Sequence, residues 1–506
     1  MSFTSDPAQG SRSRLVILAV FAINAIYFTE LFPPANGPNE LSRYEAVVAF
    51  VDHGTFAIDS TLKKYGDHED KSVYGGRTYS NKAPGLIFAA IPVYRLLRSF
   101  APPPKDSWSP LFVLLRILTV TLASAVALAR FSRRLSREPF HDASGLVTLA
   151  VALGSPFLFY GRSFFSHAWT AALLFLAWDA VVCAEESGAG RRSDGKILLA
   201  GLLASLAAIS EYTAAPIAVF LGLRILWGGR ARSFAVFLLG AVPFLALLLV
   251  YNAACFGSAW SLSSAHEGAP QYAEAARRGL FGIGPPSPRV MLAFFFDPSR
   301  GLVLLSPFWL WAVPGFLAWW RSGQRRKDCV FAAVSVAASI VVLSGYEQWQ
   351  GGFCLAPRYL VPLTFFAAPA IPFAIRSRWS RWLFYAATAF SVAQLFLLAS
   401  SWPYIARDVI WPVANIAWWT ITHHWAAPNL GHYLGIPPVW SLLPPAAATG
   451  AALWLSVRRL SPDFPRWRTA AAVAAGLAAL ALLIAFAPPL PNGGQWRTWL
   501  INFVKV

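Results

Sequence analysis

Glu40 is the first residue whose setting could support catalysis. Asn39 is a good helix N-cap, so the sequence predicts a helix running to about Asp52. Glu40 then lies in the first turn, with Arg43 and Tyr44 on its face three and four positions later. A carboxylate at a helix N-terminus near an arginine stays ionised, which suits a general base or a metal ligand. A salt bridge at the helix start is the alternative that this spacing also allows.

Two further cations stand where a phosphate could be held. Lys82 precedes a turn that leads into an apolar stretch, and a lysine at a lipid surface beside a tight turn can bind a phosphate as a point charge. A snorkelling lysine at a helix end is the alternative. Arg116 lies about six residues inside the outer end of an apolar run, where a charge is costly and therefore indicates a function.

Other polar and aromatic residues stand where apolar runs end. His167 follows a polar junction between two runs; it could bind a metal or a phosphate, move a proton, or be structural. Arg358 follows a glycine-containing segment at 345–352 and could pair bidentately with a phosphate. Tyr346 and Trp349 could stack on a sugar ring. The residues expected to line the same site are Arg43, Tyr44, His167, Glu211, Tyr212, Tyr346, Glu347 and Trp349.

Metal and disulfide sites are less clearly indicated. An Asp-His-Glu-Asp run in the first polar segment has side chains of the types that hold a divalent cation, although a solvated loop has the same composition. We expect no cofactor to be required. The alternative is a divalent cation held by Asp67, Asp70 and His167. Cys255 and Cys354 both fall in predicted outer loops, where they could form a disulfide or remain unpaired.

The composition indicates which elements must position these residues. Of 506 residues, 56% are hydrophobic and only 13% are charged, and the mean hydropathy is +0.50. Soluble domains carry about 25% charged residues, so this chain needs lipid as a solvent. The net charge of +18 does not indicate nucleic acid, because most arginines form short clusters between apolar runs. The expected environment is membrane lipid.

About thirteen apolar runs predict an all-α polytopic membrane protein, because about 20 apolar residues cross the hydrocarbon core as a helix. The first run has a basic start like that of a signal peptide. No convincing small-residue cleavage site follows it, so we expect a retained helix. The expected spans are 14–32, 109–130, 143–163, 167–185, 196–211, 212–227, 233–254, 300–320, 328–345, 358–375, 382–401, 441–457 and 469–487.

The basic residues predict the orientation of the chain. With residues 1–13 in the cytoplasm, every short connection on that side is rich in Arg or Lys. The stretch 84–98 cannot be a span, because counting it would invert every later loop. Its short length and Pro92 predict a helix lying in the outer interface. The cytoplasmic connections are 130–137, 191–196, 224–232, 321–327, 376–381 and 458–468. The outer regions are 33–108, 255–299, 346–357, 402–440 and an interfacial tail at 488–506.

In this order, the motifs resemble the type C glycosyltransferase superfamily (GT-C), in particular the family 39-like branch of protein O-mannosyltransferases and lipid A aminoarabinose transferases. That branch has an acidic pair followed by Arg-Tyr after the first span, which residues 39–44 resemble. Its Lys-Pro-Pro element is similar to residues 82–85, and an early arginine of its second span matches Arg116. The resemblance implies a GT-C-like core at 14–254 and a variable C-terminal half at 255–487.

The resemblance also implies an activity. It is the inverting transfer of a sugar from a polyprenyl-phosphate donor to a glycan, lipid or protein acceptor, at the outer face of a bacterial inner membrane. Glu40 would be the base that deprotonates the acceptor hydroxyl. Lys82, Arg116 and Arg358 would hold the donor phosphate. The family usually has Asp where Glu40 stands and an acid where His167 stands. Both departures favour a metal-independent site with a polyprenyl monophosphate donor.

Two other functions compete with this one. A lipid-linked oligosaccharide polymerase or ligase would use a large outer loop between late spans. The loop 402–440 has suitable residues, but this function leaves Glu40 and Lys82 without a role. A lipid or sugar transporter would show repeats and ionisable residues near the midplane. Here the charged residues gather at outer helix ends, and no repeat is evident. Asp179 is the main exception, and it lies toward the cytoplasmic side of its span. The candidate residues in the late loop are Arg407, His423, His424 and His432.

Overall fold

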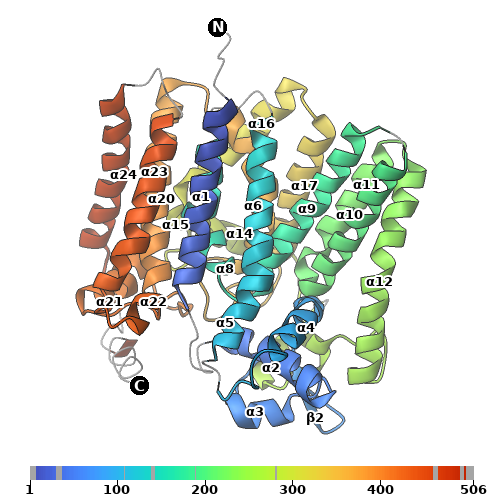
Figure 1. Cartoon of the computed structure of the whole chain (residues 1–506). Coiled ribbons are helices and arrows are strands. Elements are labelled where there is room, and N and C mark those ends of the chain that lie inside the picture. Colours follow the sequence, from blue (N-terminus) through green and yellow to red (C-terminus); the bar gives the residue numbers. More distant parts are fainter. Residues whose placement is uncertain are drawn as a thin grey trace.

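The chain folds as a bundle of helices, shown in Figure 1. The computed structural model describes residues 7–29, 37–106, 109–137, 143–188, 190–279, 282–459, 465–490 and 495–496. Seven helices in this part of the chain are long and apolar enough to cross a membrane, which confirms an all-α polytopic membrane protein. They are the continuous helix Pro110–Leu135 (α5, the π-helical η1 and α6), α9 (Ser166–Glu186), α10 (Arg191–Ser210), α12 (Ala231–Phe256), α17 (Arg326–Ser344), α20 (Arg378–Ser400) and α24 (Arg466–Phe486).

The other six predicted spans coincide with shorter or interrupted helices. The predicted span 358–375 is a series of one-turn pieces, because Pro362, Pro369 and Pro372 each lack a backbone N–H and interrupt a regular helix. The predicted span 300–320 is likewise divided by a 3-10 turn at Pro307–Trp311. The helices are α1 (Pro7–Tyr27), α7 (Ser144–Gly154), α8 (Phe157–Tyr160), α11 (Ala215–Trp227), α15 (Leu302–Leu305), α16 (Ala312–Ser322), α18 (Thr364–Ala367), α19 (Ile371–Ala374) and α23 (Leu443–Arg459).

The predicted outer segment forms a small layer at one end of the bundle, opposite the start of α1 (Figure 1). The stretch expected to lie in the outer interface is helical, and Gly85 at its start packs on the end of α10. A Cβ on Gly85 would lie 2.7 Å from the backbone nitrogen of Ser210, so this contact requires glycine. The layer consists of α2 (Pro38–His53), α3 (Asp59–Tyr65), the hairpin β1 (Lys71–Tyr74) and β2 (Arg77–Ser80), and α4 (Gly85–Arg98). Later loops add α13 (Pro270–Arg277), α21 (Trp419–Thr422) and α22 (Leu430–Tyr433). Helix α14 (Pro288–Phe296) contacts α15 and α17 of the bundle instead.

The start of α2 differs from the prediction. Gly37 is the N-cap residue and Pro38 is the first helical residue, where its missing N–H costs nothing. Asn39 is therefore not the N-cap. Its side chain instead accepts a hydrogen bond from Arg43 one turn later. Glu40 remains in the first turn, as predicted.

Helices α10 and α12 approach each other closely through a pair of glycines. A Cβ on Gly201 would lie 2.0 Å from the carbonyl oxygen of Phe237, and a Cβ on Gly240 would lie 2.1 Å from that of Leu198. Small residues allow helix backbones to approach in this way in membranes. The pair holds α12 to the bundle, although most of this helix faces outward.

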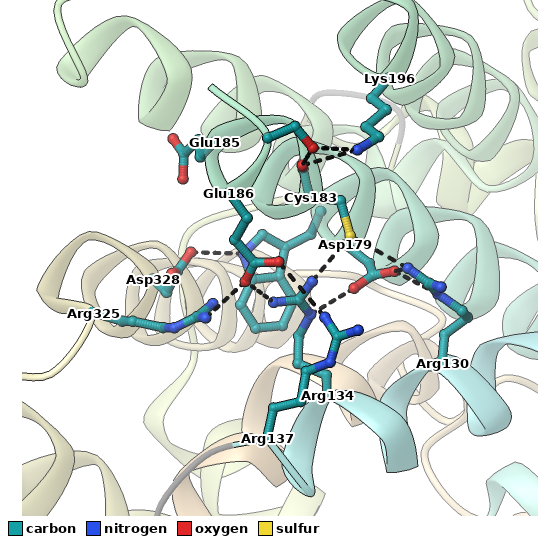
Figure 2. A network of polar contacts seen from close by, with 12 residues as sticks. Arg130, Arg134, Arg137, Asp179, Cys183, Glu185, Glu186, Lys196, Arg325 and Asp328 are labelled. Carbon is teal, nitrogen blue, oxygen red and sulfur yellow. Dashed lines mark hydrogen bonds and ion pairs between the residues drawn. The ribbon is translucent and has the colours of Figure 1, made fainter. Parts of the chain in front are cut away.

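The predicted cytoplasmic end carries a network of ion pairs, shown in Figure 2. Asp179 of α9 accepts hydrogen bonds from Arg134 at 2.5 Å and Arg130 at 2.8 Å, both from α6. Arg134 also pairs with Glu186 at 3.1 Å. From the sequence, Asp179 is the one main exception to the gathering of charged residues at outer helix ends, and it is expected toward the cytoplasmic side of its span. The structure makes it part of a helix-to-helix clamp near the end of its span.

We expect Asp179→Asn to lower the free energy of unfolding by about 3–5 kcal/mol, because it leaves Arg134 without its buried partner. The midpoint of thermal unfolding in detergent, followed by tryptophan fluorescence, measures this loss. Asp194→Asn is the matched control, because Asp194 pairs with Arg232, whose side chain is 84% exposed. That control is expected to change stability by less than about 1 kcal/mol. Equal effects of the two substitutions would contradict a buried clamp.

Candidate active site

Glu40 lies at the centre of a buried polar site. Its side chain accepts one hydrogen bond from the backbone N–H of Phe164 and another from the hydroxyl of Tyr404. The residue is 7% exposed, and burial raises the pKa of Glu40. The two hydrogen bonds, together with the charges of Arg116 and Arg43, oppose that rise. The result is a positioned carboxylate that has lost most of its water, as a general base requires.

Neither hydrogen-bond donor to Glu40 was predicted from the sequence. Tyr404 belongs to the outer loop between α20 and α21, for which we had singled out only Arg407 and three histidines. Phe164 contributes its backbone N–H, which no side-chain motif reveals. The one available signal was the density of aromatic residues in that loop, which also fits an ordinary interfacial belt.

Arg43 connects Glu40's helix to the ends of α9 and α10. It donates to Ser166 at 3.0 Å, and Ser166 donates to Glu211 at 2.9 Å. The Nδ1 atom of His167 lies 3.2 Å from the same carboxylate. The structure therefore brings Arg43, His167 and Glu211 together.

Lys82 lies beside this group and is paired with an acid. Its ammonium is 2.9 Å from Asp70, and the two side chains are 13% and 15% exposed. Burial lowers the pKa of Lys82, and the nearby charges of Arg358 and Arg43 lower it further, while Asp70 raises it. Burial raises the pKa of Asp70, but Lys82 and Arg358 outweigh that effect and hold it below its usual range.

Arg358 completes a cluster of three cations from three separate segments of the chain. It donates to the hydroxyl of Tyr359 at 3.0 Å, and its guanidinium lies over the rings of Tyr359 and Phe165 at 5.0 and 5.7 Å. Its charge acts on both Lys82 and Arg43. The positive charges of these three side chains repel one another in a buried site. Binding of an anion such as phosphate would relieve that repulsion.

Arg116 has a different position from the other cations. It is 1% exposed and donates to the carbonyl oxygens of Ala25 at 2.9 Å and Phe28 at 3.1 Å, at the end of α1. Its charge acts on Glu40. The structure therefore places Arg116 near the candidate base, where it also joins α5 to α1.

The predicted aromatic lining is only partly assembled at the site. Tyr44 is stacked between Phe112 and Phe164, with ring centroids 4.4 and 4.3 Å away, so it packs the interior. Tyr346 packs edge-on against Tyr359, which is the hydrogen-bond partner of Arg358.

The structure gives the other three predicted lining residues no hydrogen bond to the cation cluster within the described residues. Glu347 pairs with Arg278 at 2.9 Å on the surface, and Trp349 packs against Phe294. The hydroxyl of Tyr212 is buried and has no hydrogen-bond partner among the described residues.

The proposed metal ligands are not brought together. Asp67 pairs with Lys71, and Asp70 pairs with Lys82. The third, His167, lies against Glu211 instead. Within the described residues, no group of three His, Cys, Asp or Glu side chains is placed to hold a metal ion. Both cysteines that were considered for a disulfide, at positions 255 and 354, are free.

The residues that favoured a polymerase do not form one site. Arg407, His423 and His424 are exposed, and His423 stacks on Trp419 at 4.2 Å. His432 is partly buried and lies 3.5 Å from Asn429. It is Tyr404 of the same loop that reaches Glu40.

Comparison with known proteins supports the fold. No protein-family model matches the chain, and no curated protein matches it significantly. Among solved structures, ArnT from Cupriavidus metallidurans bound to undecaprenyl phosphate is similar, with a TM-score of 0.53 and 16% identity over 95% of this chain and 77% of that one. The chain has the GT-C fold. The GT-C resemblance stated from the sequence motifs is thereby confirmed.

Two further GT-C structures are similar. ArnT in the apo state matches with a TM-score of 0.51 and 16% identity, over 94% of this chain and 75% of that one. The archaeal oligosaccharyltransferase AglB from Archaeoglobus fulgidus, in complex with an inhibitory peptide and a dolichol-phosphate, has a TM-score of 0.43 and 14% identity. That match covers 96% of this chain and 59% of AglB.

Proposed function

We propose that this GT-C chain is a glycosyltransferase that moves a sugar from a polyprenyl monophosphate donor to an acceptor hydroxyl, with inversion at the anomeric carbon. The observation that carries the proposal is the pairing of a buried carboxylate, Glu40, with a nearby cluster of three cations. This is the arrangement that a displacement with a phosphate leaving group needs. The similarity to ArnT bound to undecaprenyl phosphate supports the choice of donor class.

In the proposed reaction, Glu40 accepts the proton of the acceptor hydroxyl, and the acceptor oxygen forms a bond to the anomeric carbon. The bond between that carbon and the phosphate oxygen breaks. Its electron pair leaves with the polyprenyl phosphate, whose growing charge is stabilised by Lys82, Arg358 and Arg43. Tyr404 and the N–H of Phe164 hold Glu40 in place for the proton transfer.

The location and the acceptor belong to the same proposal. We place the protein in a bacterial inner membrane with this site on the outer side, because the basic connections and the network of Figure 2 lie at the opposite end. The acceptor is a glycan, a lipid or a protein. In each case, the acceptor hydroxyl would bind in the polar site beside Glu40.

The test uses the purified chain in nanodiscs with a panel of radiolabelled polyprenyl-phosphate sugars. Release or transfer of one labelled sugar would support the proposal. If no donor on the panel is bound or turned over, the transferase assignment fails, and a polymerase or a transporter becomes the better candidate.

Turnover is expected to be unchanged by EDTA, because the leaving phosphate has three cationic side chains to stabilise it. The assay is repeated on protein treated with EDTA, before and after magnesium or manganese is added back. A loss of turnover that is restored by the added ion would contradict the metal-independent mechanism and would favour a divalent cation in the site.

A further inference from the structure

The outer loop after α12 is attached to the donor side of the candidate site, although no motif in the sequence indicated a role for it. The N–H of Gly268 donates to the carbonyl oxygen of Lys71 at 2.8 Å. Ser72 donates to the carbonyl oxygen of Ser263 at 2.8 Å, and Ser263 donates to that of Asn81 at 3.0 Å. These bonds fix the loop to the hairpin and to the residue that precedes Lys82.

Glu267 is the acidic residue that this attachment brings to the site. Its carboxylate accepts a hydrogen bond from Asn81 at 2.8 Å, and the charges of Lys82 and Asp70 both act on it. Lys82 already forms an ion pair with Asp70. Within the described residues, Glu267 forms no ion pair. Burial raises the pKa of Glu267 to about 7, against the opposing effects of Lys82 and Asn81.

We propose that Glu267 is a donor-site residue that takes up one proton from solvent when the phosphate of the lipid-linked sugar binds at Lys82. The proposal rests on the function proposed above. It adds a residue whose protonation state determines whether the donor phosphate is repelled. An ionised Glu267 repels the phosphate, whereas a protonated Glu267 does not and keeps its hydrogen bond to Asn81. Binding of an anion therefore favours the protonated form.

The sign of the pH effect follows from the raised pKa. Below about pH 7, Glu267 is already protonated, and the donor binds without cost from this residue. Above that pH, binding must bring in a proton, so donor affinity falls by up to tenfold for each further pH unit.

The charged groups around Glu267 come from the hairpin side and from its own loop. Lys71 adjoins Ser72, which forms a β-bridge with Glu267, and its ammonium is paired with Asp67. Glu69 accepts a hydrogen bond from Gln271 of the same loop.

The charges of Lys82 and Asp70 act on Glu267 from the hairpin side. Arg358 and Arg43 lie on the far side of Lys82, and their charges act on that lysine. On its own segment, the ring of His266 is bonded to Ser261 at 2.7 Å.

The experiment uses full-length protein in nanodiscs and farnesyl methyl phosphate, a phosphodiester whose single charge is constant between pH 6 and 8.5. The Kd is measured by calorimetry across this range for wild type, Glu267→Gln and Glu274→Gln. The last is the matched control, because Glu274 is 71% exposed and pairs only with Arg278 among the described residues. Wild type and the control are expected to lose about tenfold in affinity between pH 7 and 8.5, and Glu267→Gln is expected to bind almost equally at both.

A second measurement needs no variant. Wild-type binding at pH 7.5, in two buffers of different ionisation enthalpy, is expected to show uptake of between half a proton and one proton. No uptake, or the same pH dependence in Glu267→Gln as in wild type, would overturn the role of Glu267 alone. If wild type does not bind the probe at any pH, the proposed donor site itself is wrong.

Discussion

Glu40→Gln is expected to lower the rate of sugar transfer by about 10²–10⁴-fold, the usual contribution of a general base. Gln has the same length, and its amide oxygen can still accept the hydrogen bond from the N–H of Phe164. Its NH2 group then lies where the second carboxylate oxygen was and can donate to the hydroxyl of Tyr404, so the site keeps its shape. It cannot accept the acceptor's proton. The initial rate of transfer with the donor identified from the panel measures the effect.

The matched control is Glu347→Gln, the same substitution at a glutamate that pairs with Arg278 on the surface. It is expected to leave the rate within twofold of wild type. Full activity of Glu40→Gln would remove Glu40 from the mechanism. Loss of donor binding in this variant, rather than loss of rate, would give it a binding role instead.

The pH profile provides a second test of the same residue. Because burial raises the pKa of Glu40 above its ordinary value, the ionised base is lost as the pH falls through that raised pKa. The acid limb of the rate should therefore lie at a higher pH than an ordinary glutamate would give. Tyr404→Phe removes a hydrogen bond that stabilises the ionised form, so it is expected to move the limb higher still.

Lys82→Ala is expected to weaken donor binding by about 30-fold or more, because buried charge contacts of this kind contribute about 2–5 kcal/mol. The loss should appear in the Kd for farnesyl methyl phosphate, measured in nanodiscs. The variant also leaves Asp70 buried without its partner, which should lower the unfolding midpoint.

The double variant Lys82→Ala with Asp70→Asn separates the two effects. It is expected to recover the unfolding midpoint, because the unpaired acid is removed. Donor binding should remain weaker than in wild type, because the cation is still missing. If binding recovers together with stability, Lys82 maintains the structure and does not contact the phosphate. Lys63→Ala, at an exposed lysine of α3, is the surface control.

Local features of this fold could be predicted from the sequence, and contacts between distant segments could not. Apolar runs predicted the helices, because each helix depends on about 20 adjacent residues. Lys82 and Arg358 stood out because each lies beside a turn or a glycine-containing segment. Their proximity, and the pairing of Lys82 with Asp70, depends on packing between segments that no spacing rule connects.

The errors have similarly specific causes. Asn39 was expected to be the N-cap of α2, but Pro38 supplies a better first helical residue and moves the cap to Gly37. The position of Asp179 toward the cytoplasmic side of its span could be predicted, but its two arginine partners on α6 could not.

The surroundings of Glu40 also set the stage of biosynthesis at which the candidate site can form. Its two hydrogen-bond donors lie 124 and 364 residues later in the chain, so the first is translated long before the second. A polypeptide still being inserted, or one cut before its last loop, contains Glu40 but not the hydroxyl that holds it. Such a fragment lacks one of the two donors that position Glu40. Formation of the candidate site is therefore tied to synthesis of the chain at least as far as the loop after α20.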